Sequence, residues 1–217
     1  SNADLDHVLG LFILREGAAI HVHAPAAVRR ALDRGLRLSE VLSHYGGLRW
    51  HEPPTDLRPL LKSDGAESGL LYQAFEVPGK LPRYADGARE SGSTVGYLLF
   101  DPGTRGRLAF IPDLASLTDE LISRLKDCNI VLVDGTFFDD DEMVKLGISE
   151  LTASRMAHLP VGGPAGSLEA LRGLPAGRMV YLHINNTNPI LCDTTAESGR
   201  VRDAGVTVGV DGMEFLV

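Results

Sequence analysis

Residues 130–134 are Ile-Val-Leu-Val-Asp, an uninterrupted aliphatic run that ends in a carboxylate. The apolar residues 130–133 lie between polar segments and predict a buried strand that Asp134 follows. Other strands are predicted at residues 19–23, 70–77, 94–100, 107–111, 179–184 and 213–217, and helices at 8–14, 25–33, 39–45, 116–125 and from 167. Because helices alternate with apolar strands, we expect one layered α/β domain over residues 1–217.

The composition limits the classes of function. The chain has 217 residues, with 21 Lys and Arg against 29 Asp and Glu, and a net charge of −8. This acidic balance argues against a nonspecific nucleic-acid binder, which needs clustered basic residues. No apolar run reaches the roughly 18 residues that a membrane span requires. We therefore expect partners other than nucleic acid or membrane.

Two further features bear on the cellular compartment. Cys128 and Cys192 are too few for a disulfide framework or a zinc ribbon within the chain, and they are compatible with a reducing environment. The apolar stretch at 8–14 is short and follows acidic residues, so we expect no secretory signal. Together these features predict a cytoplasmic protein.

Polar residues stand where apolar elements begin or end. Asp113 follows the strand at 107–111, Asp134 follows Val133, and His183 lies near the end of its strand. Asp6 and His7 directly precede the helix at 8–14, which is predicted to be buried. Residues at strand ends can gather at one edge of an α/β sheet, where sites form. The alternative is that each acid only caps a helix or forms a turn.

A metal-ligand set can be proposed from these positions. Asp6 and His7 are adjacent, so a bend at the start of the helix would let both face one ion, and His183 could complete the set. Two histidines and one carboxylate form the facial triad that suits Fe(II) with open positions. The same ligands can hold Zn, Mn or Mg, so their identity does not choose the metal.

The other histidines differ in context. His158 stands beside a glycine-rich loop and is a candidate acid or base, or else a loop histidine satisfied by backbone. His21 and His23 alternate on one strand and face the same side, which indicates metal binding only if other ligands join them. His44 and His51 are expected on the surface.

The densest acidic run, residues 134–142, is expected to be mostly a solvated turn with carboxylates at the start of the next helix. It lacks the ligand spacing of an EF-hand loop. The polar turn at 185–189 follows His183 and could orient its imidazole or bind a substrate.

The chain resembles the pyrroloquinoline quinone (PQQ) biosynthesis protein B family, a branch of the metallo-β-lactamase fold, along its whole length. The most specific stretches are residues 1–7, 134–142, 158–160 and 183–189. The resemblance implies an αβ/βα sandwich with metal ligands at one edge between two sheets. Family members carry further N-terminal strands and a cysteine cluster for a structural zinc, which are missing from this chain.

The resemblance also implies a reduced metal site. The fold's H-x-H-x-D-H motif is here Asn2-x-Asp4-x-Asp6-His7, so two histidines of the first metal site are replaced. The second site keeps Asp6 and His7, with Asp113 at the bridging position and His183 as the last ligand. Asp4 is a further ligand or orients His7. One ion with open positions disfavours two-metal hydrolysis and leaves room for oxygen chemistry.

The function implied is a step in PQQ synthesis. The expected enzyme is an Fe(II)-dependent oxygenase that hydroxylates the tyrosine of a cross-linked Glu-Tyr precursor, with His158 and Asp134 as catalytic residues and no organic cofactor. Its expected partners are that small precursor, other PQQ biosynthesis proteins and a second copy of the chain. One alternative is a metal-dependent hydrolase with His158 as proton donor. The other is a carrier that binds or transports PQQ or its precursor.

Overall fold

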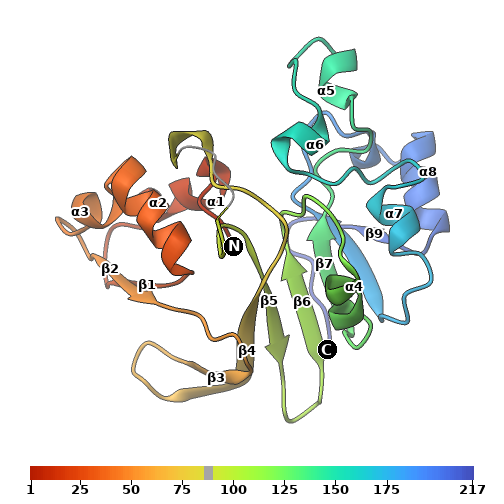
Figure 1. Cartoon of the computed structure of the whole chain (residues 1–217). Helices are drawn as coiled ribbons and strands as arrows, with labels where there is room; N and C mark the ends of the chain where they lie inside the picture. Colours follow the sequence, from red (N-terminus) through yellow and green to blue (C-terminus); the bar gives the residue numbers. More distant parts are fainter. Residues whose placement is uncertain (86–89) are drawn as a thin grey trace. The chain divides into compact units, whose positions relative to one another are not determined.

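The structure is a computed structural model that describes residues 1–85 and 90–217 (Figure 1). The chain divides into two units, Ser1–Tyr97 and Leu98–Val217. The boundary lies inside strand β5 (Val95–Phe100), so this strand contributes residues to both units.

The first unit combines helices with paired strands. Its elements in chain order are α1 (Leu5–Ile13), β1 (Ile20–His23), α2 (Ala26–Leu36), α3 (Leu38–Leu42), β2 (Leu48–His51), β3 (Arg58–Leu61), β4 (Glu67–Glu76) and the 3-10 helix η1 (Arg83–Ala85). Strands β1 and β2 pair in parallel, whereas β3 and β4 pair antiparallel. The register of β1 and β2 places His23 opposite His51.

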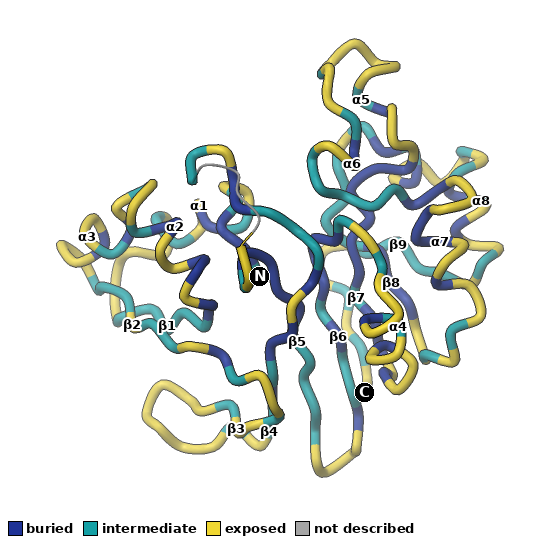
Figure 2. The backbone as a smooth tube through the Cα atoms, in the orientation of Figure 1, coloured by how far each residue is buried: buried dark blue, intermediate teal, exposed yellow. Residues whose placement is uncertain are grey.

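Helices α2 and α3 supply the core of the first unit. Val28, Ala31 and Leu32 recur at helical spacing on one face of α2 and are buried, while the opposite face is exposed (Figure 2). They pack with Leu38 and Leu42 of α3, and partly buried residues of β1 and β2 lie against this cluster. Each fully buried leucine contributes about 1.5–3 kcal/mol, so this face holds β1 and β2 in place.

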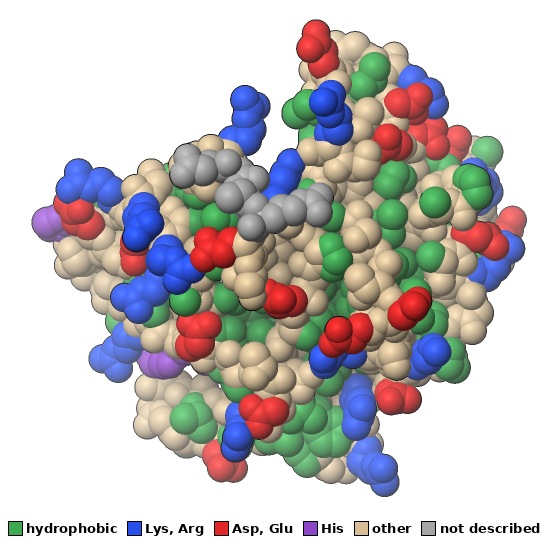
Figure 3. Space-filling view, in the orientation of Figure 1, with side chains coloured by type: hydrophobic (Ala, Val, Ile, Leu, Met, Phe, Trp, Pro, Cys, Tyr) green, Lys and Arg blue, Asp and Glu red, His purple; other side chains and the backbone are tan. Residues whose placement is uncertain are grey.

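Charged side chains of both signs cover the outer surface of α2 and α3 (Figure 3). Arg29 lies 3.5 Å from Asp33, and Arg37 pairs with Glu40. Exposed pairs of this kind contribute at most about 1 kcal/mol each. The apolar face, rather than ion pairing, therefore stabilises this part of the unit.

The second unit contains a parallel sheet. Its elements after β5 are β6 (Arg107–Ile111), α4 (Asp119–Leu125), β7 (Ile130–Asp134), α5 (Glu142–Lys145), α6 (Ala153–Met156), α7 (Ser167–Ala170), β8 (Arg178–Leu182), the 3-10 helix η2 (Pro189–Leu191), α8 (Ala196–Asp203) and β9 (Thr207–Val208). Strands β6, β7, β8 and β9 are neighbours in that order and all run parallel. Parallel neighbours need crossover connections, and α4 lies in the one between β6 and β7.

Most strand predictions are confirmed. The strand at 107–111 has the predicted bounds, and those at 94–100 and 130–133 differ from β5 and β7 by one residue. The aliphatic residues of β7 explain its central place, because parallel strands are covered on both faces. Val131 and Val133 are fully buried.

The strand predicted at 213–217 is wrong. After β9 the chain turns, with Met213 N donating to Val210 O at 3.2 Å, and residues 213–217 form no strand. Their apolar composition resembles that of a strand. Composition alone, however, does not provide a neighbouring strand with which to pair.

Three details of the predicted helices also need correction. Helix α1 forms near the predicted 8–14, but Ile13 is 75% exposed, so the helix is not buried as a whole. Helix α2 continues through Gly35 and ends where Arg37 adopts a left-handed backbone, φ 51°. Gly35 serves close packing, since a Cβ there would collide with the Tyr84 ring. Helix α4 begins at Asp119 rather than at the predicted residue 116, and Thr118 caps it by accepting from the backbone N–H of the third residue of the helix.

The sequence pattern between the strands predicted at 70–77 and 94–100, rich in Gly, Pro and charged residues, indicates a loop over 78–92. This segment contains η1, and its residues 86–89 lie outside the described part of the chain. Within residues 1–85 and 90–217, the helices lack the length and apolar character needed to cross a membrane.

Candidate functional site

Three of the expected site residues follow the carboxyl ends of adjacent parallel strands. Asp113 comes two residues after β6, Asp134 is the last residue of β7, and His183 directly follows β8. The register places Asp134 opposite Leu182, one residue before His183. Parallel strands end at the same edge of a sheet, which is where ligands bind in α/β folds. The sheet of the second unit therefore brings these side chains to one place.

Asp134 is buried and saturated with hydrogen bonds. Its Oδ1 accepts from the Thr136 N–H at 2.9 Å and from the Thr136 hydroxyl at 2.6 Å. Its Oδ2 accepts from the Leu114 N–H at 2.9 Å and lies 2.8 Å from His158 Nδ1. With its lone pairs used in this way, the carboxylate is suited to orient His158 rather than to bind an ion.

His158 comes from the loop after α6. Ala157 leaves that helix in a left-handed conformation, φ 73°, and the imidazole is largely buried. Burial lowers the pKa of His158, but the hydrogen bond and charge of Asp134, together with the charge of Asp113, outweigh it and raise the pKa above its usual value. Because Nδ1 faces Asp134, Nε2 is the nitrogen left for a metal ion or a substrate proton.

His183 is held by Thr136. Its backbone has φ 56°, a left-handed conformation that costs a non-glycine residue of the order of 1 kcal/mol. The Thr136 hydroxyl lies 2.8 Å from His183 Nδ1 and 2.9 Å from the His183 carbonyl oxygen. If the hydroxyl donates to the Asp134 carboxylate, its strongest acceptor, it accepts from His183 Nδ1–H. That tautomer leaves the lone pair of Nε2 for a metal ion.

The second unit contains a set of side chains that fits a divalent metal ion. Asp113, His158 and His183 each offer one ligand atom, and these atoms all lie within 4.8 Å of one another. The His158 and His183 rings are nearly parallel, with centroids 5.6 Å apart. One carboxylate and two imidazoles are common donors to zinc and to non-haem iron. His158 is therefore both a possible ligand and the expected acid or base.

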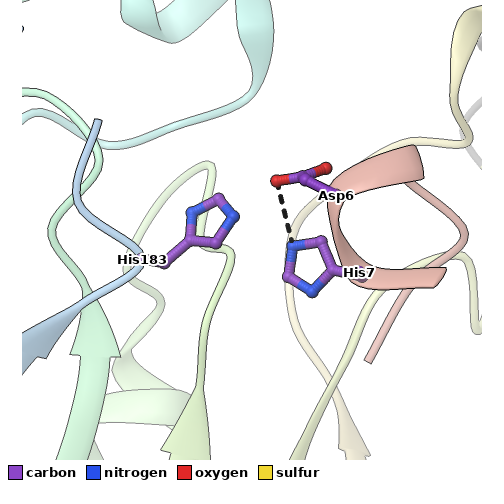
Figure 4. Close-up of side chains that lie close together, drawn as sticks. All are labelled: Asp6, His7 and His183. Atoms are coloured by element: carbon purple, nitrogen blue, oxygen red, sulfur yellow. Dashed lines mark ion pairs between the residues drawn. The ribbon is translucent and has the colours of Figure 1, made fainter. Parts of the chain in front are cut away.

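The remaining expected ligands belong to the first unit. Asp4 is the N-cap residue of α1, and Asp6 and His7 lie in its first turn. His7 Nε2 is 3.7 Å from Asp6 Oδ2, and the Asp6 side chain is 64% exposed (Figure 4). Both residues therefore lie inside the helix, whereas the sequence predicted that they precede it. The joint coordination of one ion by Asp6, His7 and His183 stays a prediction.

Several polar residues around the site carry no functional signal in the sequence. Thr136 is 7% exposed and contacts both histidines of the second unit. Glu142, expected at a solvated turn, is buried and accepts from the Phe138 N–H and the Thr187 hydroxyl. Asn188 Nδ2 donates to Gly135 O at 2.8 Å. These bonds tie the acidic run to the turn after His183, whereas residues 139–141 are exposed as expected.

A hollow of about 450 Å³ borders His183. Apolar side chains line much of it, including Leu132, Leu182, Met213 and Phe215. This volume is in the range of small-molecule sites, which are mostly apolar with a few polar groups. The hollow could accept a small aromatic or aliphatic group next to His183.

Comparisons with known proteins agree with this architecture. The model of the β-lactamase superfamily domain matches residues 1–184. Coenzyme PQQ synthesis protein B of Cupriavidus necator is 40% identical over 100% of this chain and 71% of its own length. The protein of the same name from Pseudomonas putida (strain W619) is 36% identical over 99% of this chain and 71% of its own length.

A solved structure supports the same relationship. The crystal structure of Zn(2+)-bound PqqB from Methylobacterium extorquens is 31% identical, with a TM-score of 0.84. It matches 98% of this chain and 70% of its own chain. The fold class is thus that of the metallo-β-lactamases, and the chain belongs to the coenzyme PQQ synthesis protein B family.

Proposed function

We propose that the chain acts in PQQ synthesis as an Fe(II)-dependent oxygenase that hydroxylates a small tyrosine-derived precursor, cross-linked Glu-Tyr. The observation that carries the metal requirement is that Asp113 and His183 place ligand atoms within 4.8 Å of each other in one unit, with His158 beside them as the base. The relative crystallised with Zn(2+) supports a divalent ion in the family. Two imidazoles and a carboxylate with open positions favour iron among the alternatives Zn, Mn and Mg.

Asp113 and His183 are the ligands that this proposal takes from the second unit. Asp6 and His7, with Asp4 as a further ligand or orienting group, enter it from the sequence motif. When bound, Fe(II) supplies the one-electron chemistry that dioxygen requires. Hydroxylation of a C–H bond then places one oxygen atom in the product, releases the other as water, and consumes two electrons from an external reductant.

The residues His158 and Asp134 supply proton transfer. His158 Nε2 can accept the proton of the precursor's phenol, and the Asp134 carboxylate at 2.8 Å stabilises the imidazolium that forms. The raised pKa of His158 strengthens it as a base. The apolar hollow beside His183 is of a size and character to hold the aromatic ring of such a precursor.

A metal-dependent hydrolase is the second candidate. The same buried Asp134–His158 pair could instead donate a proton to a leaving group, since an imidazolium held by a carboxylate is a general acid. This candidate requires no dioxygen, which separates it from the first. We propose cytoplasmic action in either case, with other PQQ biosynthesis proteins and a second copy of the chain as partners.

The test is a single-turnover assay. The protein is loaded anaerobically with Fe(II), mixed with cross-linked Glu-Tyr and a reductant, and exposed to isotopically labelled dioxygen. A product that has gained one labelled oxygen atom supports the oxygenase. Hydrolysis without dioxygen supports the second candidate, and binding without turnover supports the non-enzymatic carrier. The His44→Ala variant should give the same product as the unsubstituted protein, because His44 is exposed on the short segment after α3.

A further inference from the structure

The first unit contains a cluster of three histidines in addition to His7. His21 and His23 lie two residues apart on β1 and therefore face the same side. His51 of β2 lies opposite His23 in the parallel register. The expected surface position of His51 is wrong, because it is half-buried between the other two rings. The strand pairing thus supplies the partner that the H-x-H pattern lacked in the sequence.

The imidazoles contact one another directly. His51 Nε2 lies 3.1 Å from His21 Nδ1, and the two rings are within 19° of parallel. The His23 ring stacks on His51 with centroids 4.6 Å apart. Two nitrogens at this separation share either a proton or a metal ion. For two metal–nitrogen bonds of about 2.0–2.1 Å at a tetrahedral angle, the expected nitrogen separation is roughly 3.3 Å.

His23 is oriented by a buried phenol. Its Nδ1 lies 2.8 Å from Tyr72 Oη, and Tyr72 is 7% exposed. Burial raises the pKa of Tyr72, so the phenol stays protonated at neutral pH and can accept from Nδ1–H. Tyr97 Oη also donates to the His23 carbonyl oxygen at 2.7 Å, which fixes the backbone of β1. Metal-binding histidines typically make this kind of bond through their second nitrogen.

We propose that His21, His51 and His23 bind a divalent transition-metal ion in the first unit, as a site additional to the ligands assigned above. His21 Nδ1 and His51 Nε2 are the first two ligands. The third is Nε2 of His23, the nitrogen that does not bond to Tyr72, and the stacked ring shifts toward the ion while Nδ1 stays on Tyr72. Imidazole donors without a carboxylate suit Zn(II), Ni(II) or Cu(II), and water can complete a zinc site. Tyr72 is the positioning residue for His23.

The experiment is a Co(II) titration of the full chain after chelator treatment, followed by absorption in the region of tetrahedral Co(II). The titration is carried out on His183→Ala, so that the second-unit site does not contribute. We expect this variant to bind Co(II) and Zn(II) and to melt at a higher temperature with Zn(II). Adding His21→Gln or His51→Gln should weaken binding at least 10–100-fold, the usual cost of losing even an outer partner. Adding His44→Gln should change nothing.

Glutamine preserves polarity and approximate size, so these variants are expected to fold, and circular dichroism of each variant checks this. Tyr72→Phe removes the phenol and should weaken binding without abolishing it. The proposal is overturned if the His183→Ala chain takes up neither Co(II) nor Zn(II), or if the His21 and His51 variants titrate like it. These outcomes do not depend on the oxygenase, because no turnover is measured.

Discussion

The Nδ1 atom of His158 lies 2.8 Å from Oδ2 of Asp134, a carboxylate that is 1% exposed. Three further donors, from Leu114 and Thr136, hold the same carboxylate in place. The orientation of His158 is therefore set by a group that belongs to the sheet edge itself. We therefore expect both the stability of the fold and the function of the site to depend on Asp134.

Asp134→Ala should be strongly destabilising. The substitution leaves the buried Leu114 and Thr136 N–H groups without their acceptor, and each unsatisfied donor costs about 1–3 kcal/mol. We expect the free energy of unfolding in urea to fall by at least about 2 kcal/mol. Asp139→Ala is the control, since the Asp139 side chain is 52% exposed and its loss should cost less than about 0.5 kcal/mol. Equal effects of the two substitutions would contradict this role of Asp134.

Thr136→Val should weaken metal binding without removing a ligand. Valine keeps the branched shape but cannot hydrogen-bond to His183 Nδ1, so the imidazole loses its fixed tautomer and orientation. We expect about 10–100-fold weaker Fe(II) affinity in an anaerobic titration. Thr136→Ser, which keeps the hydroxyl, should restore most of it. Unchanged affinity in the valine variant would mean that Thr136 serves only packing.

Two substitutions of His183 can separate the cost of its left-handed backbone from the loss of a metal ligand. Both His183→Ala and His183→Gly remove the imidazole and should lose metal affinity equally. Glycine, however, adopts φ 56° without the steric penalty that alanine retains. The glycine variant should be more stable than the alanine variant by about 1 kcal/mol in urea unfolding. Identical stabilities would show that the conformation at 183 carries no cost.

Features formed by residues close together in the sequence could be predicted, whereas contacts between distant residues could not. The aliphatic run of β7 and the acid that ends it are local, and both were predicted. The Asp134–His158 bond joins residues 24 positions apart, so the sequence suggested both residues but not their contact. The clustering of His51 with His23 likewise depends on the pairing of β1 with β2. Thr136 carried no signal in the sequence beyond its place two residues after Asp134.

The prediction of a strand at 213–217 was wrong because it rested on composition alone. Its residues have the composition of a strand, but the turn before Met213 leads the chain away from β9. Strand formation requires a partner as well as a pattern. The buried position of Glu142 could not be predicted either, because its acceptor role depends on Thr187, which is distant in sequence.

Stability of the metal-free protein should depend on pH through His23. The pKa of His23 is lowered, first by burial and then by the charges of His51 and His21. The unfolded chain, with a histidine pKa of about 6.5, therefore binds this proton more readily than the folded chain. The contribution of His23 is fully present above about pH 6.5 and is lost as the pH falls through the lower folded pKa.

We expect the free energy of unfolding in urea, with chelator present, to decline between roughly pH 7 and pH 5. His23→Gln should make that decline shallower, because it removes the titrating group. His44→Gln is the matched control, since His44 is exposed, and should keep the wild-type slope. A steeper decline in the His23 variant would have the wrong sign for a lowered pKa.

The most direct test of the central claim is an anaerobic Fe(II) titration of His183→Ala and Asp113→Asn. Both are made in a chain that already carries His51→Gln, so that only the centre of the second unit is measured. A metal centre built on these residues predicts that each variant loses affinity by at least 10–100-fold relative to the His51→Gln parent. The folded state of each is checked by circular dichroism. Fe(II) affinity equal to that of the parent in both variants would contradict the metal centre and the oxygenase proposed from it.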